Sequence, residues 1–133
     1  MPFYADLTPY VYLPEPADHP AQNVGWLAEG HPFPTGAVPA GFVDRLGRLA
    51  LRHPVHRTRG WEECAFCDGD HPTEAEVDGE RQPVGDAEIR VTGPDDRRFA
   101  APTLVVHYVA AHGYRPPDEF VDAVMADDRA SPR

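Results

Sequence analysis

The sequence contains no lysine, one serine (Ser131) and only two cysteines, Cys64 and Cys67. Since every basic residue is arginine, the absence of lysine indicates biased codon usage. Two cysteines three positions apart cannot form the disulfide framework of a small secreted domain, so the pair indicates a metal or redox site in a reducing compartment. The longest uncharged apolar stretch, around Leu104 to Ala111, is far too short to span a bilayer. Because no apolar run follows a basic start, we expect a cytoplasmic protein with no membrane association.

Common catalytic signatures are missing as well. The sequence has no glycine-rich phosphate-binding loop, no Gly-x-Ser-x-Gly and no His-Glu-x-x-His. No reaction class is therefore indicated, and whether the chain is an enzyme stays open at this point.

The composition is that of a loop-rich globular chain. It has 133 residues, 16 prolines, 11 glycines and 41% apolar residues, which predicts a single domain over residues 1–133. The formal net charge of −10 makes nucleic acid and anionic membranes unfavourable partners and favours a basic protein partner. Against this balance, residues 45–59 contain five arginines and no acid. The simpler interpretation is a solvated face, and nucleic-acid binding through this arginine stripe is the third alternative for the function.

Hydrophobic periodicity predicts about three helices. The first covers Ala40 to Arg52, where apolar residues recur at helical spacing between two prolines. The second lies between Thr103 and Gly113, although its β-branched residues leave a strand as the alternative. The third covers residues 116–125, where two prolines and two acids form a typical first turn.

The strand signals are fewer. Alternating residues predict a β-hairpin that pairs residues 88–91 with 97–100 around a Gly-Pro turn, and a short edge strand is predicted at 10–13 between two prolines. Residues 68–85 are acidic and rich in turn formers, which predicts a mobile loop, and the tail 128–133 is expected to fray. Together these elements predict an α+β fold.

The cysteines and two later histidines form the main candidate site. The spacing is Cys64-x2-Cys67, thirty-nine residues, and then His107-x4-His112. Thiolate sulfur and imidazole nitrogen are the preferred ligands of Zn²⁺, and Gly69 suits a tight turn that presents both sulfurs to one ion. We therefore predict a zinc site whose ligands are Cys64, Cys67, His107 and His112.

The histidine pair is the weaker half of this prediction. Residues five apart on a helix point roughly 140° from each other, so both reach one ion only if the helix distorts or ends between them. Gly113 gives the helix a reason to end there. His112 is the first ligand that we would replace, and His71, four residues after Cys67, is the leading substitute.

Two other interpretations of the cysteine pair remain open. A redox dithiol has the same spacing, although the acids that follow Cys67 would oppose thiolate formation. The cysteines could also be free, buried and unrelated to the histidines. With four ligands a zinc ion would be structural, and the order of cysteine turn, hairpin and ligand-bearing helix is a treble-clef-like layout. With three ligands and an open position it would be catalytic.

Several stretches of the chain also resemble a family of small bacterial proteins of uncharacterised function. The resemblance extends from about Tyr4 to Val124, and it implies a bacterial, cytoplasmic protein without implying an activity. The stretches that carry it are Asn23-Val24-Gly25-Trp26-Leu27, His31-Pro32-Phe33-Pro34-Thr35-Gly36, Cys64-Ala65-Phe66-Cys67, Ala101-Pro102-Thr103-Leu104, His107-Tyr108 and His112-Gly113-Tyr114-Arg115-Pro116-Pro117.

The sequence thus predicts a small zinc-stabilised α+β domain that acts through its surface as a binding or accessory protein. The alternative is a metal-dependent enzyme of unknown substrate. Such an enzyme would use an open zinc site near His31 or His71, or a small pocket lined by Trp26, Phe33 and Tyr114.

Overall fold

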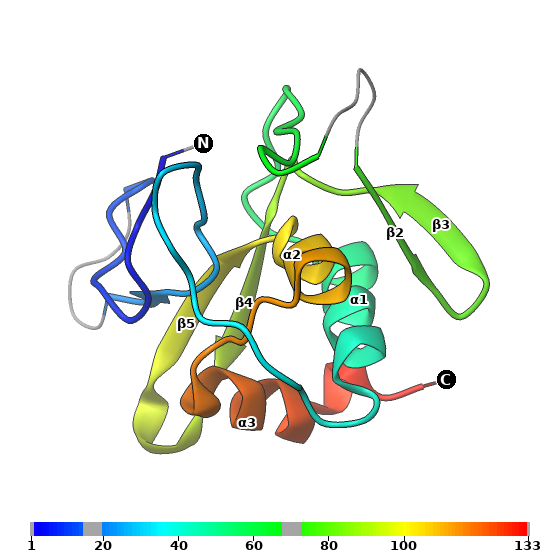
Figure 1. Cartoon of the computed structure of the whole chain (residues 1–133). Helices are drawn as coiled ribbons and strands as arrows, with labels where there is room; N and C mark the ends of the chain where they lie inside the picture. The colour runs from blue at the N-terminus through cyan, green and yellow to red at the C-terminus, as the bar shows by residue number, and fades with distance from the viewer. Residues whose placement is uncertain (1, 15–19, 68–72, 133) are drawn as a thin grey trace.

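A three-stranded sheet in the order β1-β5-β4 forms the centre of the molecule (Figure 1). The computed structural model describes residues 2–14, 20–67 and 73–132. Strands β4 (Glu88–Thr92) and β5 (Arg98–Pro102) are antiparallel, and the short β1 (Gln22–Asn23) runs parallel to β5. A 3₁₀ turn, η1 (Pro94–Asp96), joins β4 to β5, so the hairpin predicted from the alternating residues is confirmed.

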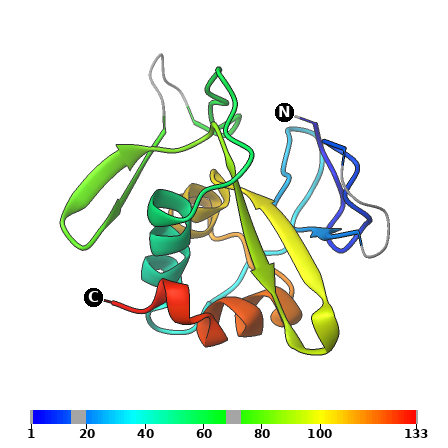
Figure 2. The ribbon, with the colours of Figure 1, turned by 180° about the vertical axis from the view of Figure 1, so that it is seen from behind.

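The three predicted helices are present and pack on one side of this sheet. They are α1 (Phe42–Arg52), α2 (Val105–His112) and α3 (Asp118–Ala126). The two opposite views agree that the helices lie on one side of β4 and β5 and the amino-terminal segment on the other (Figures 1 and 2). None of the helices in the described ranges is long and apolar enough to cross a membrane.

The main core lies between the sheet and the helices. Alternation along the two long strands turns one row of apolar side chains toward the helices, because successive residues of a strand point to opposite faces. This row packs with Phe42 and Leu46 of α1 and with Phe120 of α3, all of which are fully buried. The inward-facing strand residues are Ile89, Val91, Phe99 and Ala101.

The amino-terminal segment forms a second, smaller core on the opposite face of the sheet. Trp26 is 2% exposed, packs with Tyr10 against Ala100 of β5, and donates a hydrogen bond from Nε1 to the Ala100 oxygen at 3.0 Å. Trp26 is therefore a core residue. The edge strand predicted at 10–13 is wrong: only an isolated bridge between Pro9 and Gln22 forms there, since the flanking prolines fix their own backbone angles and lack donors.

The prediction of a mobile loop over residues 68–85 is wrong for residues 74–83. Residues 68–72 lie outside the described residues, but β2 (Glu74–Val77) and β3 (Glu80–Pro83) pair as an antiparallel hairpin. Asp78 and Gly79 turn this hairpin with positive φ values of 53° and 80°, and Asp-Gly is a preferred pair for such turns. Only Ala75 and Val77 face the core, so the apolar alternation was too short to be recognised.

The prediction of a frayed tail is wrong for residues 128–130. These residues form a 3₁₀ turn, η2 (Asp128–Ala130), and Ala130 is completely buried. Arg48 on α1 donates a hydrogen bond from Nη1 to the Ala130 oxygen at 3.0 Å, and Arg45 donates to the main-chain oxygens of Val124 and Asp127. The carboxyl end is thus held to α1 by arginine side chains.

The same contacts correct the interpretation of the arginine stripe. Besides its bond to the tail, Arg48 pairs with Asp78 at 2.9 Å, Arg52 pairs with Asp78 at 2.8 Å, and Arg57 pairs with Asp86 at 3.0 Å. Arg45 donates hydrogen bonds to the tail, as described above. Four of the five arginines between residues 45 and 59 therefore bind other groups of the same chain. Their positive charges are thus paired or hydrogen-bonded within the chain.

The Asp78 contacts predict an acid-dependent loss of stability. Hydrogen bonds from Arg48, followed by those from Arg52, lower the pKa of Asp78 from 3.8 to about 2. Because the folded-state pKa is depressed, this stabilisation is present above the unfolded pKa of 3.8 and is lost as pH falls toward 2. Asp78→Asn is expected to lower Tm by several degrees at pH 7 and by little at pH 2, as measured by circular dichroism.

Asp122→Asn provides the control for this experiment, since it removes one negative charge from an exposed position on α3. Asparagine also tolerates the positive φ of position 78, so the variant tests the ion pair and not the turn. A Tm difference between Asp78→Asn and the wild type that stays constant from pH 7 to pH 2 would contradict the prediction.

Candidate metal centre

The structure brings the two cysteines and two histidines of the candidate site together. One possible ligand atom from each of Cys64, Cys67, His107 and His112 lies within 4.8 Å of all the others. His112 Nε2 is 3.3 Å from each cysteine sulfur and 3.2 Å from His107 Nε2, and Cys67 Sγ is 3.2 Å from His107 Nε2. Among the described residues, this group is the one that could hold a metal ion.

A tight turn supplies the two sulfurs. The Cys67 N–H donates to the Cys64 oxygen at 3.3 Å, which folds the backbone back on itself. The backbone N–H groups of Phe66 and Cys67 also donate hydrogen bonds to the Cys64 side chain. Such donors favour the thiolate over the thiol, which is the form that binds a metal.

Helix α2 supplies the two nitrogens. His107 is the third residue of α2 and His112 is its last, after which Gly113 adopts a left-handed conformation with φ of 69°. The N–H groups of Gly113 and Tyr114 both donate to the Tyr108 oxygen, which closes the carboxyl end of the helix. The helix thus ends immediately after His112, and the two imidazoles bring their Nε2 atoms to 3.2 Å from each other.

Hydrogen bonding alone does not explain how close these atoms lie. Nε2 of His112 is within 3.3 Å of three other donor or acceptor atoms at once. A ring nitrogen carries either one proton or one lone pair, so it can make one good hydrogen bond, not three. A shared cation between the four atoms would account for all the close approaches.

The surroundings of Cys64 and His107 shift the pKa of both side chains. Burial, together with the neighbouring Cys67, raises the pKa of the Cys64 thiol to about 11, so without a cation this thiol holds its proton at neutral pH. Burial and the adjacent His112 lower the pKa of His107, which keeps its imidazole neutral. Neutral imidazole is the form that binds a metal, and a cation would displace the thiol proton.

Aromatic side chains fix the cysteine turn against α2. Phe66, between the two cysteines, has its ring centroid 5.6 Å from that of His112, 5.9 Å from that of Tyr108 and 5.5 Å from that of Phe33. Phe33 also packs on Tyr114, with a centroid distance of 6.0 Å. The aromatic residues of three separate stretches therefore meet beside the four possible ligands.

Glycine 85 connects the two ligand-bearing segments. Its oxygen accepts a hydrogen bond from the Glu62 N–H at 2.8 Å, and its N–H donates to Thr103 Oγ1 at 2.9 Å. Glu62 lies two residues before Cys64, and Thr103 lies two residues before the start of α2. Sequence reasoning missed Gly85, because a single glycine in a turn-rich stretch carries no signal that distinguishes it from its neighbours.

The remaining candidate residues lie elsewhere. His71 falls outside the described residues. His31 stacks on Phe3 with a centroid distance of 3.8 Å and is not part of the cluster. Trp26 packs in the amino-terminal core, whereas Phe33 and Tyr114 pack in the main core beside α2.

A family model described as a domain of unknown function, DUF7919, matches residues 2–125. The chain belongs to this family. The resemblance drawn from its sequence stretches is therefore confirmed, and the matched range of the DUF7919 domain includes all four residues of the cluster. No curated protein and no solved structure matches the chain.

Proposed function

We propose that Cys64, Cys67, His107 and His112 hold a zinc ion that stabilises the fold. Zinc bonds of about 2.3 Å to sulfur and about 2.0–2.1 Å to nitrogen would place neighbouring ligands of a tetrahedron roughly 3.3–3.8 Å apart. The four close approaches of 3.2–3.3 Å lie within a few tenths of an ångström of that range. This convergence of two sulfurs and two nitrogens is the single observation that carries the proposal.

A structural role suits this donor set better than a catalytic one. Four protein ligands complete the tetrahedron and leave no position for water or substrate. Two thiolates also donate charge to the ion, which weakens it as a Lewis acid. A cysteine turn followed in the chain by hairpins and then by a ligand-bearing helix supports a treble-clef-like arrangement around the ion.

With a structural ion, the chain acts through its surface as a small cytoplasmic binding or accessory protein. The net charge of −10 favours a basic protein partner, since unlike charges speed association and suppress wrong partners. The internal use of Arg45, Arg48, Arg52 and Arg57 supports the same choice over nucleic acid.

The metal content of the untagged, reduced protein tests this proposal. Elemental analysis is expected to find about one zinc per chain, and both thiols should react with a thiol reagent only after chelation. Cobalt substitution adds a check on the ligands, because a tetrahedral site with two thiolates has intense visible absorption and sulfur-to-metal charge-transfer bands.

Two results would count against the proposal. If the protein contained no metal and both thiols reacted before any chelator was added, Cys64 and Cys67 would be ordinary free cysteines. A cobalt spectrum that changes when a small anion such as azide is added would reveal an open coordination position and would favour the metal-dependent enzyme instead.

A further inference from the structure

A second concave site lies between the amino-terminal segment and the edge of the sheet. It is a cavity of ≈ 40 Å³ whose lining includes two aromatic residues, Tyr12 and Trp26, and three carboxylates, Glu62, Asp86 and Glu88. Roughly 10–15 Å³ holds one water molecule, so the space suits the tip of one side chain. Pockets for free metabolites or nucleotides are larger, on the order of 300–1,000 Å³.

Two of these carboxylates are buried and already attract arginine. Glu88, 3% exposed, accepts hydrogen bonds from Arg90 and, at 2.6 Å, from the Tyr10 hydroxyl. Asp86, 8% exposed, pairs with Arg57 at 3.0 Å. The Arg57 side chain is itself 61% exposed, so it can leave Asp86 at little cost when another cation arrives.

Aromatic faces add to the attraction for a cation. The Tyr12 ring lies 5.3 Å from the Trp26 ring, and Tyr4 packs edge-on against Trp26 at 5.6 Å. A guanidinium or ammonium group gains energy over such ring faces. The chain already uses this contact nearby, since the Arg90 guanidinium lies 4.5 Å from the centre of the Tyr10 ring.

Exposed apolar residues lie in the lining of this cavity or next to lining residues in the chain and the sheet. Tyr12, 36% exposed, lines it directly and Val11, 71% exposed, is its neighbour in the chain. Val55, 36% exposed, is paired with Glu88, and Trp61, 43% exposed, immediately precedes Glu62. Large exposed apolar side chains are enriched at protein interaction surfaces.

We propose that this cavity binds an arginine or lysine side chain of a basic protein partner, with Tyr12 and Trp61 packing against the residues beside it. The carboxylates match the charge of the inserted group, the aromatic rings match its flat or rounded face, and the volume matches its size. This inference rests on the proposed binding role of the chain, but it does not require the metal.

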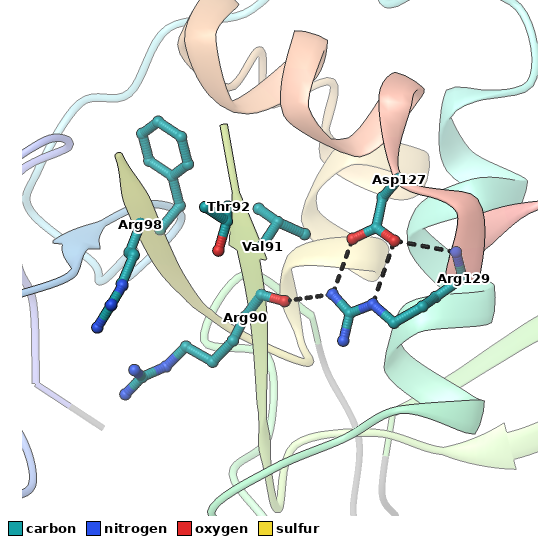
Figure 3. Close-up of a pocket in the computed structure, with 7 residues that line it drawn as sticks. Arg90, Val91, Thr92, Arg98, Asp127 and Arg129 are labelled. Carbon is teal, nitrogen blue, oxygen red and sulfur yellow. Dashed lines mark hydrogen bonds and ion pairs between the residues drawn. The ribbon is translucent and has the colours of Figure 1, made fainter. Parts of the chain in front are cut away.

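A larger charged groove is less suited to a ligand. A groove of ≈ 500 Å³ at β4 and η2 is lined by Arg90, Arg98 and Arg129, which would suggest an anion (Figure 3). Figure 3 shows, however, that the Arg129 guanidinium is bonded to Asp127 and to the main-chain oxygen of Arg90. The Asp127 carboxylate in the lining would also repel an anion.

A blocked hexa-arginine peptide is the probe, and it is titrated into the metal-loaded full chain. We expect chemical-shift changes in two-dimensional NMR spectra to concentrate on Tyr12, the Trp26 indole N–H, Asp86 and Glu88, with no response to a blocked hexa-glutamine peptide. Tyr12→Ala and Glu62→Gln are each expected to raise Kd by about fivefold or more.

Glu80→Gln is the matched control, because it removes the same charge from the exposed β3 strand. It is expected to change Kd by less than about twofold. The inference would be overturned if Glu62→Gln and Glu80→Gln weakened binding equally, or if the shift changes spread over the β2–β3 hairpin. Absence of peptide binding, or stronger binding of a single-stranded oligonucleotide to this cavity, would overturn it as well. Zinc content, measured for every variant, separates these outcomes from a failure of the proposed metal site.

Discussion

Cys64→Ser is expected to release the metal and to lower Tm by about 10 °C or more, which corresponds to roughly 3 kcal/mol for a chain of this length. Cys64 is 5% exposed and its sulfur lies 3.3 Å from His112 Nε2, so the variant loses an inner ligand of the cluster. Structural zinc contributes directly to folding free energy, because the unfolded chain has no assembled site. Thermal unfolding followed by circular dichroism, with zinc measured in parallel, tests this expectation.

Chelation separates the loss of the metal from the loss of a buried sulfur. In excess chelator, the Tm of the wild type is expected to fall close to that of Cys64→Ser, because neither protein then holds an ion. His112→Ala should behave like Cys64→Ser, whereas His53→Ala removes an exposed histidine outside the cluster and should leave Tm and zinc content unchanged. A Tm gap between wild type and Cys64→Ser that is unaffected by chelator would show that the sulfur stabilises the fold by packing alone.

Gly85→Ala is expected to destabilise the chain by about 3 kcal/mol or more, although it adds a single methyl group. Gly85 is buried and has a φ of 117°, which residues with a side chain rarely adopt. A Cβ at this position would lie only 2.4 Å from the Glu62 main-chain oxygen. The segment that leads to Cys64 would have to move, so we also expect weaker retention of zinc in competition with a chelator.

Gly79→Ala is the control for this prediction. Gly79 also has a positive φ, of 80°, but no heavy atom outside its two chain neighbours lies within 4 Å of the position its Cβ would take. Its substitution therefore measures the conformational cost alone, on the order of 1–2 kcal/mol, and should leave zinc binding unchanged. Equal destabilisation by the two variants, measured by urea unfolding, would show that contact with Glu62 adds nothing.

Local sequence patterns were sufficient for the regular elements with strong periodicity. The apolar spacing between Ala40 and Arg52, the capping glycine after His112 and the prolines and acids at 116–119 predicted three helices that the structure contains. The alternation around β4 and β5 predicted a hairpin that is also present. Each of these signals arises from residues a few positions apart, so no distant contact was needed to recognise it. The β2–β3 hairpin was missed because its core contact consists of only two side chains.

For the candidate site too, one part could be predicted from the sequence and the other depended on the tertiary structure. The sequence by itself determined that two thiols and two imidazoles were available at spacings that zinc sites use. Only the tertiary structure decided that His112 meets both sulfurs, because two residues five apart on a helix converge or diverge according to where that helix ends.

The tertiary structure also decided that Arg48 binds Ala130 and Asp78, and that Tyr12 and Asp86 share a cavity. Such pairs lie 30 to 82 residues apart, and their meeting depends on how the whole core packs.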